Sequence, residues 1–148
     1  MSAAWIHGAA MTAALALAGA WLPGCAPEDG PVAVPWDHAA CAECRMLVGD
    51  PRFAAQLRTV EGERRYFDDP GCLLIHLAKE TPETRGVWLH HAHEDRWLRF
   101  EETGFVPLGP SPMGYDLGAV ALATQHALGP AAALQRLREA TATGEEAP

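Results

Sequence analysis

The amino-acid sequence predicts an α+β protein of two small related ββαβ-like units, the second with a divergent helical C-terminus. Three observations lead to this fold class. Turn residues separate short hydrophobic runs of strand type, a capped apolar helix follows the first two runs, and a similar order of elements then begins again. A chain of 148 residues fits one compact domain or two very small lobes that share a core.

The first unit begins with a predicted hairpin and helix. Hydrophobic and polar side chains alternate along residues 53–60, which favours a half-buried strand, and a turn at residues 61–63 leads to a second strand at residues 65–67. Asp68 or Asp69 can cap a helix that has Pro70 at its first position and ends before Pro82. A third strand is predicted at residues 87–89.

The second unit repeats the strands and then departs from the first. Residues 97–100 and 105–108 are strand candidates. Asp116 is predicted to cap a helix over residues 117–128, and a further helix is predicted over residues 131–140 after Gly129-Pro130. The coarse order is therefore β-β-α-β followed by β-β-α-α.

The N-terminal region has the composition of a targeting segment. Residues 1–24 contain no Asp, Glu, Lys or Arg, and the apolar run from Gly8 ends at Leu22-Pro23-Gly24-Cys25. This pattern predicts a lipoprotein signal peptide over residues 1–24, with Cys25 as the lipidated residue. The alternative is an uncleaved Ala-rich transmembrane anchor of about 20 residues, which is just long enough to span a bilayer. Both interpretations place the remainder of the chain outside the cytoplasm.

Three segments are predicted beyond the signal. Residues 25–37 are rich in proline and lack periodicity, which indicates an extended tether between the lipid and the folded part. Residues 38–141 are predicted to form one folded domain, and residues 142–148 a disordered tail.

The charge excludes some partner classes. All 11 basic and 19 acidic residues lie after residue 24, so the exported part carries the full net charge of −8. An acidic surface repels phosphate backbones and anionic lipids, which argues against nucleic-acid binding and polybasic membrane docking. Such a surface is compatible with cationic partners, metal ions included.

Two segments carry soft sulfur donors. Cys41 and Cys44 form a C-x-x-C motif with Met46 two residues later, and Met113 lies in a rigid Pro- and Gly-containing loop over residues 111–115. Thiolate and thioether sulfur suit Cu(I), whereas zinc usually requires four N, S or O ligands and no second C-x-x-C is present. A redox pair, a disulfide or buried thiols would use the same spacing.

Two further groups remain open. Cys72 and His76 share one face of the predicted helix, near the N-terminus that favours a thiolate, but core packing is the favoured interpretation. His91 and His93, which follow His90, would point the same way on a strand and provide two nitrogens for a metal. Solvated loop histidines are the favoured interpretation there.

Together the segments resemble the NosL family of nitrous oxide reductase accessory proteins. The matching features, in order, are the lipoprotein signal, CAECRM at residues 41–46, YFDDPGCLL at residues 66–74, a segment containing Trp97, and SPMGYDLGA at residues 111–119. The resemblance implies a fold of two related ββαβ units. It also implies a periplasmic, membrane-anchored Cu(I) chaperone that supplies copper for the reductase's copper–sulfide centre.

Position by position, the resemblance implies Cu(I) ligation by Cys44 and Met113, with Met46 and Cys41 as weaker candidates. Transfer would proceed by ligand exchange without a catalytic residue, so no enzyme activity is expected. The implied partners are the copper-accepting reductase or its assembly factors, and the membrane through a lipid anchor. Arg45 stands where the family pattern has Gly, and the C-terminal helix replaces an expected last strand. Two alternatives are a periplasmic C-x-x-C thiol–disulfide oxidoreductase and a non-metal scaffold lipoprotein.

Overall fold

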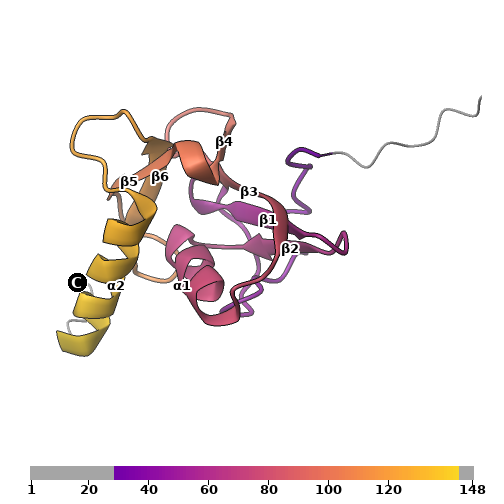
Figure 1. Cartoon of the computed structure of the whole chain (residues 1–148), viewed down its shortest axis with the longest axis horizontal. Coiled ribbons are helices and arrows are strands. Elements are labelled where there is room, and N and C mark those ends of the chain that lie inside the picture. Colours follow the sequence, from indigo (N-terminus) through magenta and orange to yellow (C-terminus); the bar gives the residue numbers. More distant parts are fainter. Residues whose placement is uncertain (1–28, 144–148) are drawn as a thin grey trace, which may run out of the picture.

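The computed structural model describes residues 29–143, which form two antiparallel sheets, two α-helices and two short 3-10 helices (Figure 1). In chain order the elements are η1 (Pro51–Phe53), β1 (Ala55–Thr59), β2 (Arg64–Phe67), α1 (Pro70–Glu80), β3 (Thr84–His90), β4 (Trp97–Arg99), η2 (Phe100–Glu102), β5 (Thr103–Pro107), β6 (Leu117–Ala121) and α2 (Pro130–Thr143). The α+β class is confirmed, and β1-β2-α1-β3 is a ββαβ unit.

The larger sheet has the strand order β2-β1-β3-β4. The predicted hairpin is confirmed, because β1 pairs antiparallel with β2 and places Ala55 opposite Phe67. The chain then crosses through α1 to β3, which pairs antiparallel with the other side of β1. Since β2 and β3 are both antiparallel to β1, they run in the same direction, and α1 connects them.

The two faces of this sheet bury different groups. Alternation along the strands sends one set of apolar side chains toward α1 and the main core: Ala55, Leu57, Phe67, Val87 and Leu89. The opposite face is covered by the segment before η1, where Val34, Ala39 and Val48 are buried against Ala54 and the side chains of Tyr66 and Trp97.

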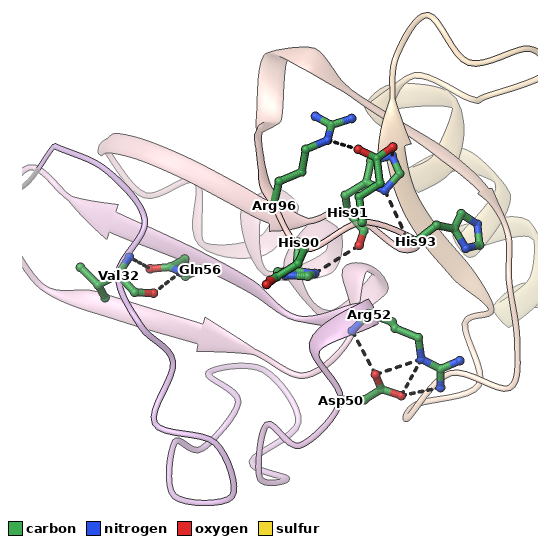
Figure 2. A network of polar contacts seen from close by, with 10 residues as sticks. Val32, Asp50, Arg52, Gln56, His90, His91, His93 and Arg96 are labelled. Carbon is green, nitrogen blue, oxygen red and sulfur yellow. Dashed lines mark hydrogen bonds and ion pairs between the residues drawn. The ribbon is translucent and has the colours of Figure 1, made fainter.

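This second contact changes the expected role of residues 29–37. Val32 and Gln56 exchange two hydrogen bonds of 3.0 Å between the Val32 backbone and the Gln56 side chain (Figure 2). The Gln56 side chain is fully buried and needs these partners. The described part of the expected tether therefore lies against the sheet and does not extend away from the domain.

Helix α1 begins and ends as the sequence predicts. Asp69 is the N-cap, its carboxylate accepts the Gly71 N–H at 2.8 Å, and Pro70 occupies the first helical position. The helix ends at Thr81, whose φ of 42° lies in the left-handed region. It packs against β1 and β2 on one side and against β6 and α2 on the other, so it lies between the two halves of the molecule (Figure 1).

The helix predicted over residues 117–128 is wrong. Leu117–Ala121 is strand β6, which pairs antiparallel with β5, and residues 122–126 form turns. The run from Leu117 to Val120 is apolar and buried throughout, and such a run has no periodicity that separates a strand from a helix. Strand pairing selects the strand for this segment, because β6 supplies the backbone hydrogen-bond partners of β5.

Asp116 correspondingly does not cap a helix. Its φ is 49°, and its Oδ1 accepts the backbone N–H of Ser111 at 2.9 Å. The carboxylate thus closes the loop that contains Met113.

The final helix is present as predicted and is longer. Helix α2 runs through Thr143, two residues into the segment expected to be a disordered tail, and buries Ala133 and Leu137 against the core. Among residues 29–143, no helix combines the length and apolar character that crossing a membrane requires.

Candidate metal centre

The C-x-x-C motif forms a closed turn fixed to the edge of β2. The Cys41 N–H donates to the Met46 carbonyl at 2.8 Å, and the Ala42 N–H donates to the Tyr66 carbonyl at 2.8 Å. Arg45 has a φ of 70°, in the region that favours glycine, so the turn accepts a residue that ordinarily avoids this conformation. The turn buries Cys41 completely and leaves Cys44 partly exposed.

A third cysteine comes from the first turn of α1. Cys72 is the third residue of the helix and is fully buried. The chain path brings Cys72 close to Cys41. Cys41 lies beside Tyr66 of β2, and only the short Asp68-Asp69 connection separates β2 from α1. The N-terminal end of a helix favours negative charge, which suits a thiolate or a metal–thiolate group.

The sulfur atoms of Cys41, Cys44 and Cys72 lie within 4.8 Å of one another, and all three cysteines are free thiols. Three metal–sulfur bonds of about 2.3 Å in a plane would place the sulfurs about 4 Å apart, so small movements would close this group around one ion. No His, Asp or Glu belongs to the group. The three cysteines could therefore hold a metal ion through sulfur alone.

The surroundings make the three thiols unequal. A hydrogen bond from Cys72 is the largest cause that lowers the pKa of Cys41, from 9.0 to about 5, and backbone hydrogen bonds from Cys44, Asp68 and Glu43 act in the same direction. Burial raises the pKa of Cys44. Donation to Cys41, together with burial, raises the pKa of Cys72. These directions favour the thiolate form at Cys41 and the thiol form at Cys44 and Cys72.

This asymmetry predicts the pH dependence of the reduced, metal-free protein. We expect the ultraviolet absorbance of one thiolate at neutral pH, disappearing as the pH falls through about 5. Because folding lowers this pKa, the thiolate's contribution to stability is complete above pH 9.0 and is lost as the pH falls toward about 5. Cys72→Ala should move the spectroscopic midpoint upward and Cys41→Ser should abolish it. Absence of thiolate absorbance in the reduced parent at neutral pH would contradict this assignment.

The C-x-x-C turn is also fixed to the later part of α1. Glu43 accepts from Lys79 Nζ at 2.7 Å and lies 3.4 Å from His76 Nδ1. Arg65 can only donate, and its Nη1 lies 3.1 Å from His76 Nε2, so this nitrogen accepts and Nδ1 carries the proton that faces Glu43. Cys72, His76 and Lys79 lie on one face of α1, which therefore supplies one sulfur and holds the turn that carries the other two.

The predicted sulfur donors lie in different places relative to the cysteine group. It brings Cys41 and Cys44 together with Cys72, which the sequence had favoured as a core residue. Met113 is half-buried and packs against the same core cluster as Cys41 and Cys72, while its backbone N–H donates to Asp69 Oδ2 at 3.2 Å. Met46 is 51% exposed. Its contacts with the turn are made by its backbone: the carbonyl accepts from the Cys41 N–H at 2.8 Å, and the N–H donates to Cys44.

The histidine segment does not form the strand pair considered above. Strand β3 ends at His90, and His91 Nδ1 accepts the backbone N–H of His93 at 3.2 Å (Figure 2). His90 contacts the His91 carbonyl and Asp95, and the ring centroids of His91 and His93 lie 6.2 Å apart. These contacts describe a local turn, and in residues 29–143 the three cysteines are the group of His, Cys or acidic residues that could hold a metal. Cys25 and the predicted signal peptide lie outside the described residues.

Comparisons of the chain with protein-family models, with curated proteins and with solved structures found no match.

Proposed function

We propose that this protein binds one Cu(I) ion through Cys41, Cys44 and Cys72 and donates it to a copper-accepting protein. The observation that carries the proposal is the convergence of three free thiols from two segments within 4.8 Å. A soft ion would give all three sulfurs a common partner.

The donor set favours Cu(I) over Zn(II). Cu(I) accepts two or three soft sulfur ligands, whereas structural zinc sites are almost always tetrahedral with Cys, His or carboxylate ligands. The cysteine group contains no His or carboxylate, and Met113 packs against the core cluster that contains Cys41 and Cys72. Thioethers suit Cu(I) and are not among the usual zinc ligands.

The exposure of the cluster supports release as well as binding. Cys41 and Cys72 are fully buried, whereas Cys44 is partly exposed. A partner's sulfur would approach on the Cys44 side and form a bond to the ion as the Cu–Cys44 bond breaks, and the freed Cys44 thiolate would take the proton that the partner's thiol loses. Further partner ligands would then replace Cys41 and Cys72 by the same exchange, which releases the ion. The copper remains Cu(I) throughout, so the transfer needs no oxidant or reductant.

The recipient and location come from the sequence resemblance to the NosL family. We propose a lipid anchor at Cys25, a location on the periplasmic face of a bacterial membrane, and delivery toward the copper centre of nitrous oxide reductase, directly or through its assembly factors. The acidic charge of −8 supports a cationic cargo and argues against nucleic acid.

A thiol–disulfide oxidoreductase fits the site less well. Such an enzyme attacks its substrate with an accessible thiolate of lowered pKa. Here the pKa of the fully buried Cys41 is lowered, and that of the more exposed Cys44 is raised. The reactive form therefore lies where a protein disulfide cannot reach it. A scaffold lipoprotein that acts by contact alone would not depend on any of the three cysteines.

An anaerobic Cu(I) titration of the detergent-solubilised full-length protein against a chromophoric chelator tests the proposal. We expect one tight equivalent, weakened in Cys44→Ser and in Met113→Ala, while Met46→Ala binds like the parent because its side chain is exposed. The loaded protein should then transfer copper to copper-free reductase. If the chelator retains the copper, or Cys44→Ser binds like the parent, the proposed site is wrong.

A further inference from the structure

The carboxylate of Asp69 connects the helix that carries Cys72 to the loop that carries Met113. Its Oδ1 accepts the Gly71 N–H at 2.8 Å, and its Oδ2 accepts the Ser111 hydroxyl at 2.6 Å and the Met113 N–H at 3.2 Å. One oxygen thus holds the start of α1, and the other holds a segment more than forty residues away in the sequence.

The loop is braced internally, so that its attachment to Asp69 acts on the loop, Met113 included, as one unit. Ser111 Oγ also accepts the Asp116 N–H at 2.9 Å, and Asp116 Oδ1 accepts the Ser111 N–H at 2.9 Å. The Gly114 N–H donates to the Ser111 carbonyl at 3.0 Å. Because these bonds close the loop on itself, the position of its Met113 backbone relative to α1 depends on Asp69.

Asp69 does more than a helix cap requires. A cap needs one acceptor, which Ser, Thr or Asn provides without charge. Asp69 is fully buried, and this burial raises its pKa despite the three hydrogen bonds, so the carboxylate is held at an electrostatic cost. The feature that a neutral cap could not reproduce is the second oxygen, which accepts from both Ser111 and Met113.

We propose that Asp69 is a positioning residue that holds the Met113 thioether beside the three cysteines and thereby favours Cu(I) over metals that bind thiolates alone. The inference rests on the proposed Cu(I) function. Met113 is half-buried and packs against the core cluster that contains Cys41 and Cys72, and its amide donates to Asp69, which precedes Cys72 by three residues. A thioether adds a soft, uncharged donor, which stabilises Cu(I) without adding a further negative charge to the buried thiolates.

Asp69→Asn separates positioning from capping. The amide oxygen can still accept from Gly71, but its NH2 group replaces the acceptor that faces Met113 and leaves two N–H donors opposite each other. We expect Cu(I) affinity to fall about 10- to 100-fold, as in Met113→Ala, because outer groups that orient metal ligands have effects of about this size. Affinity for Cd(II), which binds the three thiolates, should change by less than about threefold.

A double-mutant cycle distinguishes positioning of Met113 by Asp69 from a general effect of Asp69 on folding. If Asp69 acts through Met113, Asp69→Asn should have no further effect on Cu(I) affinity in the Met113→Ala background. X-ray absorption should show loss of one sulfur neighbour of copper in each single variant. Asp69→Ser retains a helix cap, cannot bridge to Met113, and is expected to give the same pattern should Asp69→Asn fail to fold.

Additive losses, or an equal fall in Cd(II) affinity, would overturn the inference, because Asp69 would then act on the fold as a whole. Parent-like Cu(I) binding by both Asp69→Asn and Met113→Ala would also overturn it while leaving a three-cysteine copper site intact. Failure of the parent itself to bind Cu(I) would instead refute the proposed function.

Discussion

Replacing Cys72 with serine is expected to lower the Cu(I) affinity at least about 100-fold, since residues that only orient metal ligands already contribute up to about that factor. The Cys72 sulfur is one of three that lie within 4.8 Å of one another. It comes from α1, whereas the other two come from the C-x-x-C turn. Serine has nearly the same size but supplies a hard, weakly coordinating hydroxyl, so only the two cysteines of the turn would remain. The measurement is competition with a chromophoric Cu(I) chelator under anaerobic conditions.

Cys72→Ala is the matched control for packing. Alanine keeps a small apolar side chain at a fully buried position, whereas serine adds a polar group there. Both variants should lose copper affinity, while the serine variant should lose more stability in thermal unfolding. Parent-like copper binding by Cys72→Ala together with weak binding by Cys44→Ser would show that Cys72 is a core residue, and would leave Cys41, Cys44 and Met113 as the ligands.

The first unit was predictable because its local signals agree. Alternation along β1, the turn residues after it, and the Asp69-Pro70 helix start all indicate the same hairpin and helix. β6 was not predictable from such signals, since its buried apolar run fits either a helix or a strand. Its partner β5 and the close approach of Leu108 to Gly118, where an added Cβ would lie 2.8 Å from Leu108 Cδ2, select the strand.

The site was half predictable for a related reason. The spacing of Cys41 and Cys44 is visible in the sequence, but the proximity of Cys72 depends on the Ala42–Tyr66 hydrogen bond that lays the turn along β2. Cys72 also sits in an apolar helix, where core packing explains a cysteine equally well. The helix-start signal at Asp69-Pro70 was the available clue, because it places Cys72 at the N-terminal end that favours a thiolate.

Gly71→Ala is expected to lower the free energy of unfolding by about 1–3 kcal/mol, the usual effect of overpacking, although the same change ordinarily stabilises a helix interior by about 1 kcal/mol. An added Cβ at Gly71 would lie 2.3 Å from Tyr115 Cδ2 and 2.8 Å from Tyr115 Cβ. Rotation of the Tyr115 side chain moves its ring but not its Cβ, so the loop that carries Met113 must move away from α1. Chemical denaturation measures the loss, and Cu(I) affinity should fall with it.

Tyr115→Gly provides the decisive background for this change, because it removes the three atoms that would lie nearest to the new Cβ. In that background Gly71→Ala should no longer destabilise the protein and should show its intrinsic helix preference, so the sign of its effect on stability reverses relative to Tyr115→Gly alone.

Gly129→Ala, with no atom within 4 Å of the added Cβ, is the control for glycine replacement as such and should leave copper binding unchanged. An equal destabilisation by Gly71→Ala in both backgrounds would show that the contact between α1 and the Met113 loop does not set its effect. A stabilising effect in the parent would show that the loop yields without cost, in which case it could not hold Met113 in a fixed place beside the cysteines.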